Sequence, residues 1–244
     1  MYRFFRDPGA DGVGVAFSAA LTADGSPLSL GGAHGAAGRA PGLALVEADL
    51  GLPLAVVRQV HGTDVITVTD PDGLAELGTR SADALLTTRT GIALAVRVAD
   101  CVPVLLADAA AGVVAAAHAG RAGLAAGVLQ ATVAAMRAAG ARRLTAWIGP
   151  HICGACYEVP EQLADEVAGL VPGSRSRTSW GTPALDLGAG AAGLLAGLGA
   201  DVVDVSGCTR EDPGLHSYRR DAAASGRQAG IIWLDEACRT ETAG

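Results

Sequence analysis

The chain has 244 residues, of which 50% are hydrophobic and only 4% aromatic, and its formal net charge at pH 7 is −7. This acidic balance argues against a general nucleic-acid-binding protein, which would usually present a basic face. All 18 basic residues are arginines, so neither a lysine Schiff base nor the lysine of a P-loop is available.

Runs rich in valine and isoleucine predict β-strands along most of the chain. They cover residues 14–19, 54–60, 65–69, 82–88, 92–98, 102–107, 113–117, 144–148, 202–205 and 230–234. Apolar residues at helical spacing predict helices over 124–139, 161–170 and 189–198. Hairpins cluster in the first half and helix–strand units in the second. This mixture indicates an α+β fold, a single domain over residues 1–244 with a large, sandwich-like mixed β-sheet flanked by helices.

The first candidate for chemistry is His61, in the segment RQVHGTD that follows a predicted strand. Gly62 and Asp64 favour a tight turn, which would expose the imidazole at the strand end. A histidine in a turn is more often a solvated side chain or a structural hydrogen-bond partner, so His61 alone does not establish a site.

Cys101 and His118 lie on the two sides of a predicted β-hairpin, RVADCVPVLLADAAAGVVAAAHAG. If the turn pairs Asp108 with Ala111, Cys101 faces His118. Directly opposed residues share one face of a sheet, with Cβ atoms roughly 4.5–5.5 Å apart. The hairpin therefore predicts a thiol beside an imidazole, the pair that metal sites and cysteine nucleophiles both use.

The strand around Cys101 carries two further signals. Asp100 places a charge in a buried-looking run, and Pro103 cannot donate a hydrogen bond to a sheet ladder. A lone cysteine in an apolar strand is usually inert, but an interrupted strand beside a charge suits a site better than a core.

His118 ends its strand and leads through Gly120 and Arg121 into the clearest predicted helix. Small residues let a ligand approach the backbone, a helix N-terminus attracts anions, and Arg121 offers donors for a phosphate oxygen. A Gly-rich strand–helix turn with a solvated arginine is an equally good interpretation.

Together, His61, Cys101 and His118 would form a set of three ligands suited to zinc. With Zn²⁺ bound, the two neutral imidazoles and the thiolate would give the site a net charge of about +1 and leave a fourth coordination position open. The same cysteine and His118 also suit a metal-free nucleophile and its base. Cys153 and Cys156 form a C-x-x-C pair without a second pair. We interpret this pair as mostly structural, with redox or metal chemistry as the alternative.

Near the C-terminus, Tyr218, Arg219 and Arg220 precede a predicted strand. An arginine pair beside a tyrosine suits an anionic or aromatic ligand. Ordinary ion pairing with Asp221 explains the same residues equally well.

The sequence also bears on location. The segment MYRFFRDPGADG is too charged for a signal peptide, and Arg97, Asp100 and Asp108 interrupt the most apolar region. Five cysteines, an odd number, indicate reduced thiols rather than a disulfide framework. We therefore expect a cytoplasmic protein with no membrane partner, either a monomer or a small homo-oligomer.

The motifs RQVHG, ADALLTT, VADCVPVLLAD, AHAG, IGPHICGACYEV, LDL, CTREDPGLHSYRRD and GRQAGIIWL occur in this order over roughly residues 55–234. Together they resemble the laccase-domain, or polyphenol oxidase, family, whose bacterial members are described as purine nucleoside phosphorylases. The resemblance implies zinc bound by His61, Cys101 and His118. It also implies phosphorolysis of adenosine, inosine and S-methyl-5′-thioadenosine, with adenosine deamination as a second activity. Purine nucleosides and phosphate are then the expected partners.

Under this resemblance the three zinc ligands are also catalytic, with Asp83 or Asp100 as a proton carrier or a partner of the ligands. The candidate substrate-binding residues are Arg58, Gln59, Arg121, Arg219 and Arg220.

The chain departs from the family pattern in two places. The usual Trp-Arg-Gly after His118 reads Arg121-Ala122-Gly123, so alanine stands at the usual arginine position. Ala155 replaces one of two adjacent cysteines often found before Tyr157.

Three other interpretations stay open. A metal-free hydrolase would use Cys101 as nucleophile and His118 as base, for example an amidase acting on a cell-wall precursor. A copper polyphenol oxidase is disfavoured, because the chain has five histidines and no His-x-His. The third interpretation is a binding protein with structural zinc.

Overall fold

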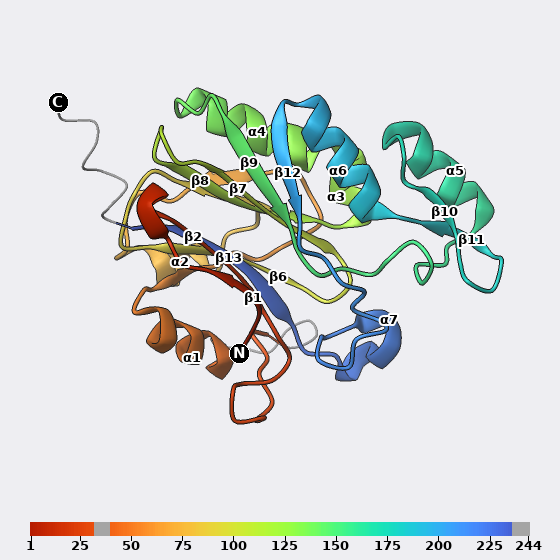
Figure 1. Ribbon diagram of the computed structural model, residues 1–244, viewed down its shortest axis with the longest axis horizontal. Coiled ribbons are helices and arrows are strands. Elements are labelled where there is room, and N and C mark those ends of the chain that lie inside the picture. The colour runs from red at the N-terminus through yellow and green to blue at the C-terminus, as the bar shows by residue number, and fades with distance from the viewer. Residues whose placement is uncertain (32–39, 236–244) are drawn as a thin grey trace.

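Two β-sheets lie face to face at the centre of the molecule (Figure 1). The computed structural model describes residues 1–31 and 40–235. The smaller sheet has the order β1-β2-β13-β6-β3, formed by Tyr2–Arg6, Val13–Ser18, Gln228–Leu234, Ala93–Val98 and Leu54–Ala55. The larger sheet has the order β12-β9-β7-β8-β5-β4, formed by Ala200–Asp204, Leu144–Ile148, Val102–Asp108, Val113–Ala119, Ala84–Thr87 and Val65–Thr67.

Helices cover the outer faces of both sheets (Figure 1). On the smaller sheet lies α1 (Pro41–Leu50), and on the larger sheet lie α3 (Arg121–Ala126), α4 (Val128–Ala138) and α6 (Leu187–Gly197). At the periphery, α5 (Glu161–Leu170) packs on the two-stranded sheet of β10 (Arg175–Arg177) and β11 (Pro183–Leu185). The short helices are α2 (Leu74–Leu77) and α7 (Tyr218–Asp221), with 3₁₀ turns at Gly9–Asp11 and Ala222–Ala224.

The predicted α+β class, with mixed sheets flanked by helices, is confirmed. Parallel pairs join β12 to β9, β3 to β6 and β4 to β5, whereas the other pairs within the two large sheets are antiparallel. The sandwich-like arrangement is formed by the five-stranded and the six-stranded sheet, which pack on each other, and a two-stranded sheet lies beside them. The extent of one domain, residues 1–244, stays a prediction. None of the helices in the described part of the chain is long and apolar enough to cross a bilayer.

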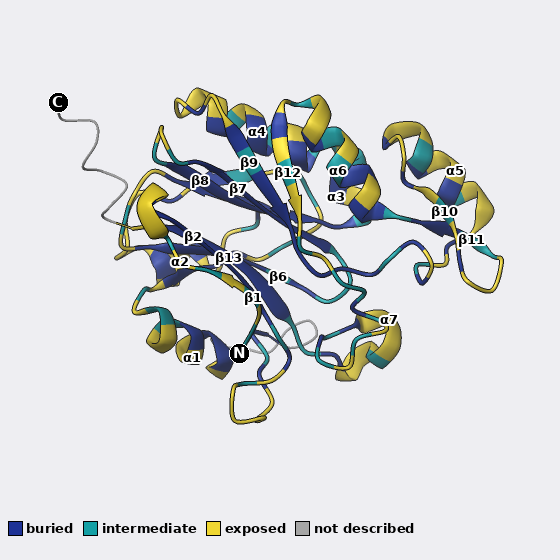
Figure 2. Cartoon of the chain, in the orientation of Figure 1, coloured by how far each residue is buried: buried dark blue, intermediate teal, exposed yellow. Residues whose placement is uncertain are grey.

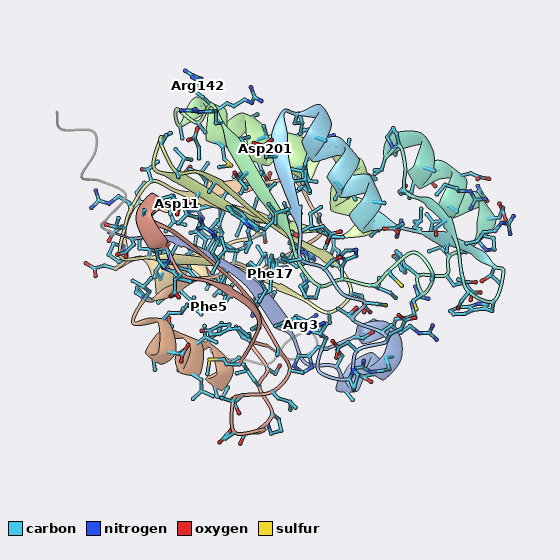
Figure 3. The ribbon with its side chains drawn as sticks, in the orientation of Figure 1. Arg3, Phe5, Asp11, Phe17, Arg142 and Asp201 are labelled. Atoms are coloured by element: carbon cyan, nitrogen blue, oxygen red, sulfur yellow. The ribbon has the colours of Figure 1, made fainter. Side chains whose placement is uncertain are left out.

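The central strands are buried on both faces, as the dark ribbons of Figure 2 show. On β7, Leu105 points into the core between the sheets, while Val104 and Leu106 pack against the helices. This double burial explains why these strands read as continuous apolar runs instead of alternating ones. Phe17 of β2 fills the same central core (Figure 3).

Several boundaries differ from the predicted ones. The helix predicted over 124–139 is interrupted at Gly127, whose φ of 100° separates α3 from α4. The strand predicted over 54–60 is a strand only at Leu54–Ala55, and beyond it Arg58 forms an isolated parallel bridge with Ser81. The edge strand Tyr2–Arg6 was missed, because two arginines interrupt its aromatic residues and none of its side chains is fully buried.

The β7–β8 hairpin has a longer turn than predicted. Asp108 pairs with Val113 instead of Ala111, and His118 pairs with Pro103 instead of Cys101. The reason is that the Asp108 carboxylate accepts the N–H of Ala111 at 3.1 Å, inside a turn of four residues. The register moves by two positions, so Cys101 and His118 stay on one face as diagonal neighbours. The predicted pairing is wrong, but the predicted face is right.

Asp108 also fixes the start of β9. Its side chain is buried, and it accepts the backbone N–H groups of Arg142 at 2.6 Å and Arg143 at 2.8 Å. Burial alone would raise the pKa of this carboxyl, but the three backbone donors lower it below the ordinary value. The carboxylate therefore ties the hairpin turn to the neighbouring strand at the rim where Figure 3 labels Arg142.

We predict that Asp108→Asn lowers the free energy of unfolding by about 1–3 kcal/mol, the usual cost of disrupting buried hydrogen bonds. Because the pKa of Asp108 is depressed in the folded protein, its contribution is complete above the unfolded pKa of about 3.9 and is lost as the pH falls further. Urea unfolding of both proteins at pH 7 and below pH 4 measures this. Asp201→Asn, at an exposed residue of β12, is the control. Equal destabilisation by both substitutions would contradict the assigned role.

Candidate metal centre

Three side chains from distant parts of the sequence converge at one end of the larger sheet. His61 comes from the loop between β3 and β4, Cys101 immediately precedes β7, and His118 lies near the end of β8. Their ligand atoms all lie within 4.8 Å of one another, and Cys101 Sγ is 3.7 Å from His61 Nε2. We call this group the His–Cys–His cluster. The structure thus brings together the three residues that the sequence singled out.

Asp83, which lies directly before β5, organises the cluster. Its buried carboxylate accepts the backbone N–H groups of Val60, His61 and Gly62 at 3.2, 2.9 and 2.6 Å. The same carboxylate lies 2.8 Å from Nδ1 of His118. A carboxylate accepts, so His118 carries its proton on Nδ1 and leaves Nε2 available to a metal.

Asp100 shapes the backbone beside the cluster. It adopts a φ of 92°, in the left-handed region that non-glycine residues rarely occupy. Its carboxylate accepts the Thr209 hydroxyl at 2.7 Å and the Arg219 N–H at 2.6 Å, and its carbonyl accepts the Ile152 N–H at 3.0 Å. These contacts engage both carboxylate oxygens and the carbonyl of Asp100. Asp100 is therefore an anchor for the backbone of Cys101.

His61 has a positive φ as well, of 60°. Strained backbone of this kind persists only where the surroundings enforce it, and such sites are often functional. Here the enforcement is the row of three N–H groups that Asp83 holds. The turn thus directs the imidazole of His61 toward Cys101.

Gly120 provides the space that the cluster needs. Continuing the hairpin register by one step places it opposite Cys101. A Cβ atom on Gly120 would lie 2.4 Å from Cδ2 of His61 and 3.3 Å from Sγ of Cys101. Its φ of −72° is open to any residue, so the requirement for glycine is steric and comes from the cluster itself.

The electrostatics of the cluster favour a thiolate. Burial raises the pKa of Cys101, but His118 and His61 outweigh that effect and lower it to about 6. Burial lowers the pKa of His118, but the Cys101 thiolate and Asp83 raise it to about 9. Burial likewise raises the pKa of Asp83, and the hydrogen bonds from His118 and Gly62 bring it below its ordinary value.

The donor set fits a divalent metal ion. One thiolate and two imidazoles are zinc ligands, and a carboxylate on the far nitrogen of His118 is the usual partner of a zinc-bound histidine. The observation that carries this fit is the convergence of three donor atoms, which all lie within 4.8 Å of one another.

Two arginines and a tyrosine lie beside the cluster. The guanidinium of Arg219 lies 5.1 Å from the ring centroid of Tyr157, and Arg121 is the first residue of α3. Burial raises the pKa of Tyr157, while the positive charges of Arg121 and Arg219 oppose the rise and the Cys101 thiolate adds to it. We call Arg121, Tyr157 and Arg219 the Arg–Tyr wall. Tyr157 was missed as a site residue, although it lies in the motif IGPHICGACYEV.

The structure does not bring the other candidates to the cluster. Arg58 donates to the Ser81 hydroxyl. The amide of Gln59 exchanges two hydrogen bonds with the backbone of Arg97 on β6. Arg220 donates to the carbonyls of Thr209, Arg210, Asp212 and Leu215 and pairs with Asp221, which closes the loop before α7.

The fold and the cluster together define a mixed β-sandwich protein with a candidate metal centre at one end of a sheet. The chain belongs to the family described as "Multi-copper polyphenol oxidoreductase laccase", which matches residues 41–235.

Curated relatives and solved structures are similar to the chain over most of its length. The chain is 53% identical to "Purine nucleoside phosphorylase ORF3" of Streptomyces griseus, over 85% of this chain and 87% of the relative. It is 48% identical to "Purine nucleoside phosphorylase SCO2081" of Streptomyces coelicolor, over 85% and 88%. Among solved structures, Neisseria meningitidis protein NMB0706 superposes with a TM-score of 0.77 at 34% identity, over 95% of this chain and 98% of that one.

We predict that Gly120→Ala abolishes tight metal binding at the His–Cys–His cluster while leaving the protein folded. The new methyl group must displace the ring of His61, which breaks the convergence of the three donors. Zinc titration followed by calorimetry measures the binding, and circular dichroism measures the fold. Gly169→Ala, on α5 with nothing within 4 Å of its added methyl, is the matched control. Unchanged zinc affinity in Gly120→Ala would contradict the steric argument.

Proposed function

We propose that the chain is a zinc-dependent purine nucleoside phosphorylase that acts on adenosine, inosine and S-methyl-5′-thioadenosine, with adenosine deamination as a second activity. The observation that carries the proposal is the position of the His–Cys–His cluster directly beside the Arg–Tyr wall. The names of the relatives support the same reaction. The expected partners are small molecules, and the expected location is the cytoplasm.

His61, Cys101 and His118 would hold the zinc ion. When bound, the ion supplies Lewis-acid charge at the open side of the cluster. The chain's own contribution is to keep the three donors in the right state. Asp83 holds the proton of His118 on Nδ1 and fixes the turn of His61, and the neighbouring imidazoles keep Cys101 deprotonated near neutral pH.

Phosphorolysis needs an anion held in line with the glycosidic bond. A phosphate oxygen forms a bond to C1′ of the ribose while the C1′–N9 bond breaks, and the electron pair of that bond leaves with the purine, which takes up a proton. The products are the free base and ribose 1-phosphate, or 5-methylthioribose 1-phosphate when the substrate is S-methyl-5′-thioadenosine. Arg121 and Arg219 of the Arg–Tyr wall would orient phosphate for this attack and balance its charge.

In this proposal Arg121 takes the role of the arginine that the family usually has one position later. Ala122 stands at the usual position, but Arg121, one residue earlier, acts electrostatically on Tyr157 together with Arg219. Two guanidinium groups on one wall provide the donors that one arginine would otherwise supply.

One observation favours a second candidate, a metal-free hydrolase. Cys101, His118 and Asp83 form a chain of thiol, imidazole and carboxylate, which is also the arrangement of a cysteine nucleophile with its base and orienting acid. An amidase acting on a cell-wall precursor would use it. His61, 3.7 Å from the same sulfur, favours the metal centre instead, because a nucleophile has no use for a second imidazole there.

The reaction is tested by incubating the full chain, purified without a histidine tag, with each of the three nucleosides in the presence and absence of phosphate. We expect phosphate-dependent release of free base, and phosphate-independent conversion of adenosine to inosine. Removal of zinc with a chelator and the substitution Cys101→Ser should both reduce base release to background, and added zinc should restore only the chelated protein. Full release of base by the metal-free protein would contradict the zinc assignment, and no turnover of any of the three nucleosides would favour the hydrolase.

We predict that Arg121→Ala raises the KM for phosphate by about 10- to 100-fold, equal to about 1.4–2.8 kcal/mol, because a charge-assisted hydrogen bond is lost. The KM for the nucleoside should change much less. Arg219→Ala is expected to act in the same way. Arg89→Ala, at an exposed residue after β5, is the control for loss of one positive charge. An equal rise in KM for both substrates would contradict the assignment of phosphate to the Arg–Tyr wall.

A further inference from the structure

A second group of metal-ligating side chains lies outside the His–Cys–His cluster. Cys153, Cys156, Cys208 and Glu211 place their ligand atoms within 4.8 Å of one another. We call them the thiolate cluster. Of the five cysteines in the chain, Cys101 belongs to the first centre and Cys238 lies outside the described residues, so this cluster gathers the other three.

We propose that the thiolate cluster is a second, structural zinc site with a Cys₃Glu ligand set. Three sulfurs and one carboxylate oxygen are a closed set of four donors, which is the number that structural zinc sites use. The proposal does not depend on which reaction the first centre catalyses.

The backbone supports the cluster as a site. Two tight turns face each other, and each supplies ligands at its first and fourth residues. In the first turn the N–H of Cys156 donates to the carbonyl of Cys153 at 3.0 Å, and in the second the N–H of Glu211 donates to the carbonyl of Cys208 at 3.2 Å. His151 forms a parallel bridge with Cys208, which holds the two turns side by side.

The distances suit a tetrahedral ion. With zinc–sulfur bonds of 2.3 Å and zinc–oxygen bonds near 2.0 Å, a sulfur and an oxygen ligand lie about 3.5 Å apart. Cys156 Sγ and Glu211 Oε1 are 3.3 Å apart. In addition, the backbone N–H of Cys153 points at Sγ of Cys208 over 3.5 Å, and such donors stabilise a thiolate bound to a metal.

The sequence explains why the second half of the site was missed. Cys153 and Cys156 form a C-x-x-C pair, and zinc sites of this kind usually show a second C-x-x-C. Here the second pair reads Cys208-x-x-Glu211, so the fourth ligand is a carboxylate and the pattern has no standard form. Only the fold brings the two turns, 55 residues apart, together.

A metal at this site would support the first centre through Asp100. Ile152, next to Cys153, donates its N–H to the carbonyl of Asp100, and Thr209, next to Cys208, donates its hydroxyl to the Asp100 carboxylate. Both turns therefore hold the residue that precedes Cys101. A cation that joins the turns fixes Asp100 in its left-handed conformation.

The test is the zinc stoichiometry of the full-length, untagged chain, kept reduced and measured by elemental analysis after dialysis. We expect two zinc ions per chain in the natural protein, one in His61→Ala, one in Cys208→Ser and none in the double variant. Substitution with cobalt gives a second readout, because the sulfur-to-cobalt charge-transfer band grows with the number of thiolates. The band that survives in His61→Ala should be markedly stronger than the band in Cys208→Ser.

Glu211→Gln keeps the proposal testable if Cys208→Ser fails to fold. It should weaken zinc binding at the second site at least about tenfold, since even the loss of a partner outside the ligand shell has that effect. Glu166→Gln, an exposed residue of α5, is the matched control and should change nothing. The proposal would be overturned if the natural protein held one zinc ion per chain and the variants Cys208→Ser and Glu211→Gln both retained it. So would a disulfide among Cys153, Cys156 and Cys208 in the reduced, zinc-supplied protein, found by mass spectrometry.

Discussion

The candidate centre depends on one buried carboxylate. Asp83 accepts three backbone N–H groups from the His61 turn and the Nδ1 proton of His118, so one ligand from a loop and one from a strand are aligned by the same side chain. A buried charge of this kind would be very costly alone, and the four donors replace the hydration that it lost. The carboxylate therefore acts as a template, since neither the turn nor the imidazole has the right orientation without it.

The fold lets this template work because small residues lie next to it. Alanine and glycine at the ends of β5 and β8 allow the His61 turn to approach the hairpin closely, and Gly120 leaves room for the imidazole beside the sulfur. The helices bury the other face of the larger sheet, so its central strands are packed on both faces. Packing of this kind holds neighbouring donor atoms in place for a metal, because a loosely held ligand would reduce the affinity.

Much of this architecture could be predicted from the sequence. The apolar runs predicted the central strands of both sheets with small errors at their ends but missed the edge strand Tyr2–Arg6, and the hairpin pattern placed Cys101 and His118 on one face. The register was wrong by two positions, because the side-chain hydrogen bond of Asp108 lengthens the turn and no apolar pattern records it. Asp83 was proposed only as one of two alternatives, since its four partners come from residues up to 35 positions away. Tyr157 and Glu211 were not predicted as site residues, because their roles depend on which loops meet in space.

The His–Cys–His cluster and the thiolate cluster are connected through the hydrogen bonds of one residue. Asp100 lies between them, with its backbone leading into Cys101 and its polar atoms held by residues next to Cys153 and Cys208. Arg219 donates to the same carboxylate through its backbone while its guanidinium lies over Tyr157. A displacement of the Cys153 and Cys208 turns would therefore reach the thiolate and the Arg–Tyr wall together. These contacts give a physical reason for the left-handed conformation of Asp100, because hydrogen bonds from residues beside both turns hold its carboxylate and its carbonyl.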